Sequence, residues 1–237
     1  MNPYAETLVQ ELEVRSVPQK ADWWNSYLKG EIRFVGTSIP EIRKLLIEKN
    51  GSDGLDHLPM NQQVSMVNGL MRSQFAEHKL AAILYVQLFW LFTQNNSFLL
   101  SLISDWFDER YIFDWNTTDW LSTKILTPVL DSGDEKVLWT LKKWNRDPYL
   151  WKARASLVPF AHSKYIREHK TYIERFADIL IRREERFAKT AVGWVLREYS
   201  KLDEEFVLDF LSKHVKYTTW DVKRNALKYH RQKLKNS

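Results

Sequence analysis

The apolar residues of this chain recur with the 3.6-residue period of an α-helix, and this spacing constrains the fold more than any other feature. In the segment Phe187–Lys201, a core stripe stands at positions i, i+3, i+4 and i+7: Val192, Val195, Leu196 and Tyr199. Only 7 Gly and 7 Pro interrupt the 237 residues, which disfavours strands joined by tight turns. We therefore predict one all-α domain spanning residues 1–237, with short loops between its helices.

One segment departs from the helical pattern. In residues 106–115, WFDERYIFDW, aromatic and β-branched residues surround a polar Asp108-Glu109-Arg110 tip. Such a pattern is typical of two short strands joined by a turn. We predict a short β-hairpin inserted between helices near 106–115.

The sequence excludes several classes of protein. It has no Cys, and its six His lack the HExxH or other metal-ligand spacing. There is no Gly-rich phosphate loop, so we expect neither a metal nor a small-molecule cofactor. The first residues are acidic where a signal peptide needs cations, and the longest apolar run, 80–92, is too short to span a bilayer. We expect a monomeric cytoplasmic protein with no membrane contact.

Charge is distributed unevenly along the chain. Residues 1–135 carry 11 Lys+Arg and 18 Asp+Glu, a balance of −7, whereas residues 136–237 carry 24 and 12, a balance of +12. A compact protein with one strongly basic half suits a polyanionic partner. The asymmetry is also compatible with a basic face that serves only solubility.

Trp194 stands apart from the core stripe of its own predicted helix. At about 100° per residue, it lies about 200° around the helix from Val192. Thr190, Arg197 and Lys201, at i−4, i+3 and i+7, share its side. The pattern predicts a large aromatic ring displayed beside two cations.

Two further segments repeat this combination. Trp151 is followed by Arg154 at i+3, and Trp120 by Lys124 at i+4. Indole rings can stack on bases or pack against sugars while neighbouring cations hold phosphates. A single such pair is more often a core Trp beside a cation with a buried stem. Three pairs in a chain with a basic half favour nucleic-acid binding.

At these residues the chain resembles the AlkD-like family of DNA glycosylases, which remove cationic alkylpurines. The resemblance runs nearly end to end. It is carried by MNPYAETLVQEL, Tyr27-Leu28-Lys29, Phe34-Val35-Gly36, Pro40 through Arg43, Trp151–Ala155 and, most specifically, Ala191–Tyr199. It implies a HEAT-like-repeat α-solenoid, a stack of antiparallel helix pairs whose concave basic surface cradles duplex DNA. From periodicity alone, degenerate helical repeats and an ordinary helical bundle both remain open.

The resemblance also implies roles for single residues. Trp120 and Trp194 correspond to the two Trp that frame a damaged nucleotide, and Arg154 to the nearby Arg. Tyr27 corresponds to an N-terminal DNA contact.

The catalytic Asp of the family has no counterpart here. In register with Pro128, its position falls on Lys124. Cleavage of the glycosidic bond develops positive charge on the sugar, which a carboxylate stabilises. Two like charges about 4 Å apart at an effective dielectric near 20 repel by roughly 4 kcal/mol. We therefore predict weak or absent base excision.

A paralogous branch, the AlkF/AlkG-like proteins, is similar in the insertion between Leu80 and Trp120. The likeness lies in Phe107-Asp108 and Asp114–Trp120. The branch is associated with an extra hairpin and with branched DNA such as Holliday junctions. The resemblance thus implies a protein of the DNA-repair family that binds branched or distorted DNA.

Three other functions remain open at this point. The chain could be an active alkylpurine glycosylase that uses another carboxylate, Asp119 or Asp114. Lys124 could attack C1′ as a Schiff-base nucleophile. A helical solenoid could also bind polypeptides and have no affinity for DNA.

Overall fold

The structure, a computed structural model, describes residues 2–230, and within this range it is all-helical. It contains no β-strand there; extended backbone pairs only at an isolated bridge between Arg33 and Phe75. The predicted all-α fold is therefore confirmed. The described helices include none long and apolar enough to cross a membrane.

The chain divides into two compact units, which are described separately. Unit 1 comprises Met1–Asn95 and Asp105–Trp120, and unit 2 comprises Asn96–Ser104 and Leu121–Ser237. The predicted organisation as one domain over residues 1–237 stays a prediction.

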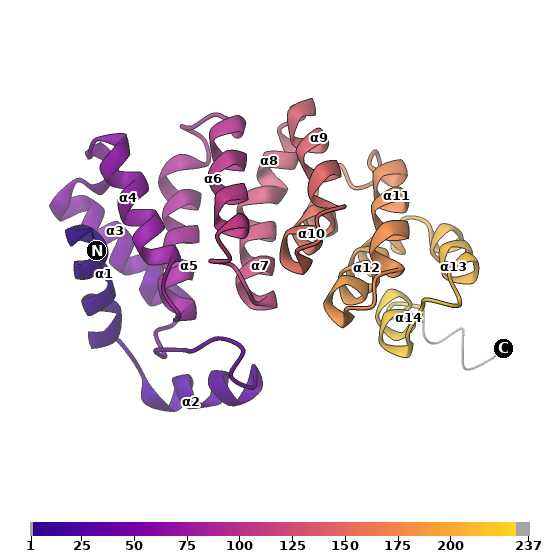
Figure 1. Cartoon of the computed structure of the whole chain (residues 1–237), viewed down its shortest axis with the longest axis horizontal. Helices are drawn as coiled ribbons and strands as arrows, with labels where there is room; N and C mark the ends of the chain where they lie inside the picture. The colour runs from indigo at the N-terminus through magenta and orange to yellow at the C-terminus, as the bar shows by residue number, and fades with distance from the viewer. Residues whose placement is uncertain (1, 231–237) are drawn as a thin grey trace. The chain divides into compact units, whose positions relative to one another are not determined.

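Unit 1 is built from the helices near the N-terminus (Figure 1). They are α1 (Pro3–Val14), α2 (Pro18–Tyr27), α3 (Ile39–Asp53), the 3₁₀ turn η1 (Leu55–His57), α4 (Met60–Met71), α5 (Ala76–Tyr85), the π-helical turn η2 (Val86–Trp90), the end of α6 (Asn96–Asp108) and α7 (Trp115–Leu121). Helices α1, α3, α4 and α5 pack on one another. Their core side chains, such as Leu8, Leu45 and Leu70, are at most 1% exposed.

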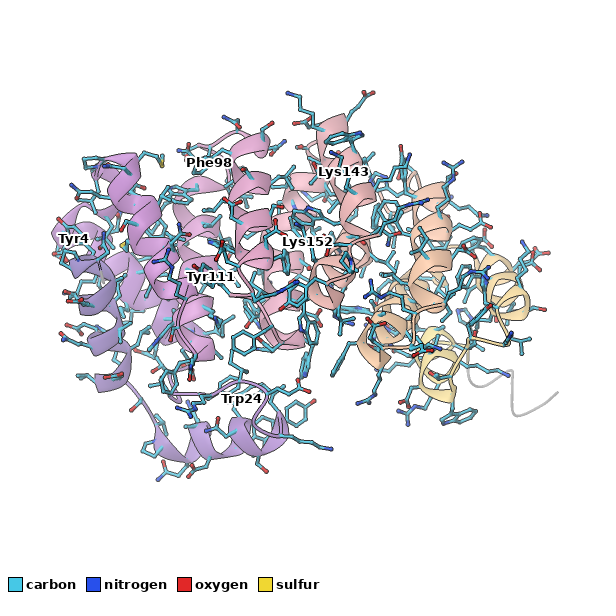
Figure 2. All side chains as sticks on the ribbon, in the orientation of Figure 1. Tyr4, Trp24, Phe98, Tyr111, Lys143 and Lys152 are labelled. Atoms are coloured by element: carbon cyan, nitrogen blue, oxygen red, sulfur yellow. The ribbon has the colours of Figure 1, made fainter. Side chains whose placement is uncertain are left out.

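Helix α2 is attached differently, because none of its residues is buried. Trp24 reaches from α2 to stack on Phe34, with ring centroids 5.4 Å apart (Figure 2). The side chain of Asn25 accepts a hydrogen bond of 2.9 Å from the Phe34 amide. Gly36, at φ +103°, lies so close to the Val17 carbonyl oxygen that any side chain there would collide with it.

The predicted β-hairpin near 106–115 is wrong. Helix α6 continues to Asp108, and α7 begins at Trp115. Arg110 adopts a left-handed conformation (φ 59°), and the Tyr111 amide donates to the Trp106 carbonyl, so this turn closes the end of the helix. Trp106 is 1% exposed. The aromatic residues that suggested strands are there because the end of α6 is deeply buried.

Unit 2 continues the helical succession. It comprises the start of α6, the π-helical turn η3 (Ser122–Leu126), α8 (Thr127–Asp131), α9 (Glu135–Trp144), α10 (Leu150–Leu157), the 3₁₀ turn η4 (Val158–His162), α11 (Lys170–Ile181), α12 (Arg186–Tyr199), α13 (Glu204–Lys213) and α14 (Trp220–Ala226). Figure 1 shows α9, α11 and α13 along one side of the unit and α10, α12 and α14 along the other.

Helix α10 forms the centre of unit 2. Every residue from Trp151 to Phe160 is buried, and α10 packs on α9, α11 and α12. Buried Asn145 joins these helices, because its side-chain amide donates to Ser156 Oγ (3.0 Å) and to the Phe176 carbonyl (3.3 Å). Hydrogen bonds from one buried side chain to two other helices fix how the three helices are aligned.

Candidate nucleic-acid interface

One face of α12 carries the polar and aromatic residues that the sequence analysis singled out. Val192, Leu196 and Tyr199 are buried as predicted, while Trp194 is half-buried on the other side of the helix. The face is a row at i, i+4, i+8, i+11 and i+15: Arg186, Thr190, Trp194, Arg197 and Lys201. We call this row, together with the neighbouring residues of α14, the α12–α14 face.

Trp194 has a polar atom that packing alone does not explain. Its indole Nε1 is buried, and no acceptor for it exists among the described residues. Its ring meets the edge of exposed His162, with centroids 5.6 Å apart. A buried donor without an acceptor is uncommon and costs roughly 1–3 kcal/mol. Because this atom is closed to solvent, only the exposed part of the half-buried Trp194 ring is open to a ligand.

Arg197 and Lys201 flank Glu198 at the end of this face. The Arg197 guanidinium lies 2.7 Å from the Glu198 carboxylate and also donates to Asn225 Oδ1 at 3.2 Å, and Lys201 Nζ contacts the same carboxylate. Burial raises the pKa of Glu198, but the hydrogen bonds from Lys201 and Arg197 outweigh it, and the net pKa is lowered. The trio keeps one net positive charge on the face.

The expectation that Trp151 and Arg154 form a displayed pair needs correction. Trp151 is 8% exposed and packs against Phe187, and Arg154 is 4% exposed. Arg154 Nη1 donates to the Phe187 carbonyl (2.6 Å) and to Thr190 Oγ1 (3.1 Å). Arg154 therefore holds the start of α12 in place from below the surface.

Besides Arg186, which begins the row, two cations complete the α12–α14 face: Arg224 on α14 and Lys228 just after it. None of the three was predicted from the sequence. Arg186, Arg224 and Lys228 line a cavity of about 290 Å³ together with Thr190, Asp221 and Asn225. Asp221 lies 3.7 Å from Arg186 and 3.1 Å from Arg224, so one acid pairs with two of the three cations. The sequence feature that could have predicted this cluster is the i, i+4 spacing of Arg224 and Lys228. It becomes informative only once α14 is known to pack on α12.

The remaining aromatic candidates lie in unit 1. Trp120 is half-buried and lines a cavity of about 390 Å³ with Trp24 and Phe34. Tyr27 is 57% exposed, and its ring stacks on that of Trp23 at 5.2 Å with an interplanar angle of 6°. Tyr27 is thus the more accessible of the two.

The candidate acid–base residues differ in their accessibility. Asp114 is fully buried before α7, where its Oδ1 accepts from the Thr117 amide at 2.8 Å. Burial raises the pKa of this carboxyl. Asp114 is therefore a helix cap and cannot reach a substrate. Asp119 is half-buried.

Lys124 lies half-buried inside the π-helical turn η3. The Thr127 amide donates to the Ser122 carbonyl, five residues earlier, instead of four as in an α-helix. No group of three His, Asp or Glu residues in the described part of the chain could hold a metal ion.

Comparisons with known proteins place the chain in a family. A family model of DNA alkylation repair enzymes matches residues 8–230. The solved structure of a predicted DNA alkylation repair enzyme from Enterococcus faecalis has the same fold, with a TM-score of 0.76 over 91% of this chain and 97% of that chain at 18% identity. None of the curated proteins compared with the chain matches it. The chain belongs to the DNA alkylation repair enzyme family.

Proposed function

We propose that this protein binds DNA through the α12–α14 face, prefers branched or distorted DNA, and excises alkylated bases weakly or not at all. The observation that carries the proposal is the half-buried Trp194 ring, set in a row of cations on one side of α12. In this view the helices form a HEAT-like-repeat stack, and the face belongs to its DNA-cradling surface.

The electrostatics of the face support a phosphate backbone as the partner. The Arg186 side chain is 73% exposed, and Lys228 is exposed at the other rim of the same cavity. Phosphate contacts from such cations position DNA without reading its sequence, while the Trp194 ring offers a surface for a base or sugar. Arg154, Trp151 and Gly193 support the face from inside.

The positions of the candidate catalytic carboxylates support weak excision of alkylated bases. Asp114 is fully buried, and Lys124 stands at the position that the resemblance assigns to the catalytic Asp. Asp119 is the remaining candidate, so a glycosylase that uses Asp119 is the alternative function. This alternative is tested by measuring the release of free methylated purine from alkylated DNA. Efficient release that Asp119→Asn abolishes would establish this alternative and overturn the proposed lack of excision.

The binding experiment compares linear duplex with a four-way junction over a series of salt concentrations. We expect tighter binding to the junction and a steep loss of affinity with salt, because phosphate contacts release counterions. The variant Arg186→Ala/Arg224→Ala/Lys228→Ala should reduce the logarithmic salt slope by roughly 2 to 3. Equal affinities for both DNAs would remove the branched-DNA preference. No DNA binding near physiological salt would favour a protein-binding scaffold.

Borohydride trapping on abasic DNA addresses the remaining chemistry of Lys124. A covalent product that Lys124→Ala abolishes would show Schiff-base formation, whereas we expect none.

A further inference from the structure

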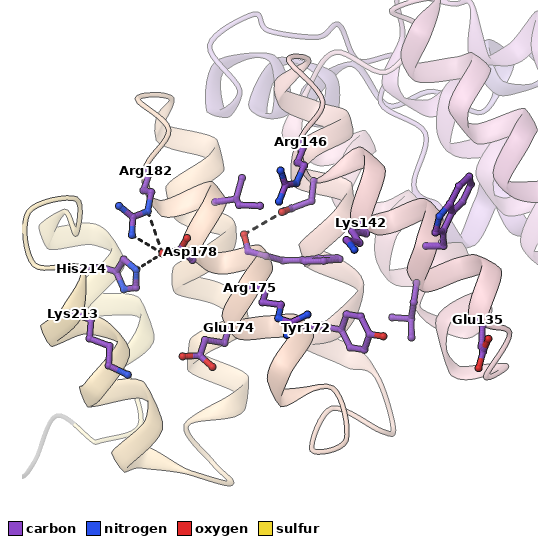
Figure 3. Close-up of a pocket in the computed structure, with 15 residues that line it drawn as sticks. Glu135, Lys142, Arg146, Tyr172, Glu174, Arg175, Asp178, Arg182, Lys213 and His214 are labelled. Atoms are coloured by element: carbon purple, nitrogen blue, oxygen red, sulfur yellow. Dashed lines mark hydrogen bonds and ion pairs between the residues drawn. The ribbon is translucent and has the colours of Figure 1, made fainter.

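A second groove lies on the other side of unit 2, among α9, α11 and α13. It encloses about 1090 Å³, and its walls are one face of α9 and one face of α11, with the end of α13 beyond them (Figure 3). None of the residues of the α12–α14 face lines it. Unit 2 thus carries two separate charged surfaces on opposite rows of helices.

The two walls repeat one pattern of side chains. On α9, Trp139 and Lys142 stand at i and i+3, and Arg146 follows in the turn just after the helix ends. On α11, Tyr172 and Arg175 stand at the same i and i+3 spacing, and Arg182 follows at the residue after the helix ends. Residues at these spacings share one face of a helix, so each wall presents a ring followed by positive charges.

The cations of the groove are available to a ligand. Within residues 2–230, the side chains of Lys142, Arg146 and Arg175 have neither an ion-pair partner nor a hydrogen-bond partner, and all of them are exposed. Arg182 is already paired with Asp178, at 2.7 Å, and His214 Nε2 lies 2.7 Å from the same carboxylate oxygen. The remaining acids, Glu135 and Glu174, lie away from Arg146 and Arg182 (Figure 3).

The groove also offers aromatic rings. Trp139 is 60% exposed, and the Nζ of Lys143 lies 3.4 Å from the centroid of its ring (Figure 2). Tyr172 is half-buried in the opposite wall. Proteins that bind single strands without sequence preference combine a positive groove for the backbone with rings on which bases stack.

From these observations we propose that the α9–α11 groove binds a single-stranded segment of nucleic acid. This inference rests on the proposed function, because the bound strand would be an unpaired arm of the same DNA that the α12–α14 face holds. The backbone would follow Lys142, Arg146 and Arg175, and Trp139 would stack on a base.

The test uses the full chain, two probes and two variants. The probes are a labelled thymidine oligonucleotide and a blunt duplex. The groove variant is Lys142→Ala/Arg146→Ala/Arg175→Ala, and the matched face variant is Arg186→Ala/Arg224→Ala/Lys228→Ala. Each removes three exposed cations from unit 2, and unchanged circular dichroism confirms that both fold.

We expect the groove variant to weaken oligonucleotide binding and to reduce its logarithmic salt slope by roughly 2, at about 0.7 per phosphate contact. Its affinity for duplex should stay within about twofold of the unmodified protein. Trp139→Ala should weaken oligonucleotide binding by roughly tenfold without changing the salt slope, because stacking releases no counterions. Phe92→Ala, at an 89% exposed position in unit 1, is the control for loss of an exposed ring.

The possible failures are distinguishable. If the groove variant binds the oligonucleotide as well as the unmodified protein does, the groove proposal is overturned whatever happens with duplex. If the face variant binds duplex normally while the groove variant loses the oligonucleotide, the proposed function fails and the groove stands. If polyglutamate binds and only its binding depends on the groove cations, the groove is a protein-docking surface instead.

Discussion

A Cβ atom at Gly193 would lie 3.2 Å from the Cα of Val222 and 3.3 Å from its carbonyl oxygen. Backbone atoms cannot move aside as the end of a side chain can. Helices α12 and α14 therefore approach this closely only because position 193 has no side chain, and the approach brings Asn225 within 3.2 Å of Arg197.

Gly193→Ala should destabilise the protein by about 1–2 kcal/mol, because overpacking outweighs the gain in helix propensity of about 1 kcal/mol. Urea unfolding followed by circular dichroism measures the change. Gly51→Ala is the matched control, since nothing lies within 4 Å of a Cβ placed there at the end of α3, and it should be neutral or stabilising. Equal effects of the two substitutions would show that α14 does not pack on Gly193.

Arg154→Met should destabilise unit 2 by about 2–4 kcal/mol. The substitution removes charge-assisted hydrogen bonds from a 4% exposed side chain to the Phe187 carbonyl and to Thr190 Oγ1. Arg175→Met removes an exposed arginine from the same unit and should change stability by less than about 0.5 kcal/mol. Similar midpoints of urea unfolding for the two variants would contradict the anchoring role of Arg154.

His78 should make the protein lose stability in mild acid. Burial lowers the pKa of His78 from 6.5 to about 4. Between these values the unfolded chain binds a proton that the folded chain does not, so stability falls as pH decreases from 6.5 towards 4. The loss amounts to roughly 3 kcal/mol across this window.

Urea titrations at pH 7, 5.5 and 4.5 on the unmodified protein and on His78→Gln measure this dependence. The variant should show a shallower decline, because it has no imidazole to protonate. Glu77, whose pKa burial raises, titrates in both proteins, so their difference isolates His78. If the stability of both proteins declined in parallel with pH, His78 would accept a proton as readily in the folded protein as in the unfolded chain.

Restoring a carboxylate should restore excision. Lys124→Asp should increase the release of methylated purines by roughly tenfold or more, because a negative charge would then stabilise the developing positive charge of the sugar. Since η3 closes over five residues, a position counted back from Pro128 is displaced relative to an ordinary helix. Thr123→Asp is therefore the register control. No gain from either substitution would show that the missing acid is not what limits excision.

The sequence predicted which side chains of a single helix are buried, because this depends on the helical period. It did not predict burial that depends on neighbouring helices. The stripe of Val192, Leu196 and Tyr199 is buried, and Trp194 lies opposite it, because both follow from rotation about one axis. Trp151 and Arg154 have the same spacing as a displayed pair, yet α10 is enclosed by other helices on all sides. A one-dimensional pattern contains no information about such enclosure.

The two other discrepancies have related causes. The aromatic residues around Asp108 were interpreted as strand formers, although it was burial of the end of α6 that selected them. The cavity formed by Arg186, Arg224 and Lys228 draws on two helices separated in sequence by α13, and only packing of α14 on α12 brings them together.

The absence of any buried residue in α2 has a consequence for its dynamics. Amide hydrogens exchange with solvent when a segment opens locally, and the free energy of opening reflects how much apolar surface the segment hides. Helix α2 hides little, so its amides should exchange long before those of α4 or α5. Tyr27 and Trp23 would then be carried on the part of unit 1 that detaches and reattaches most often, and an arriving ligand could capture them in more than one orientation.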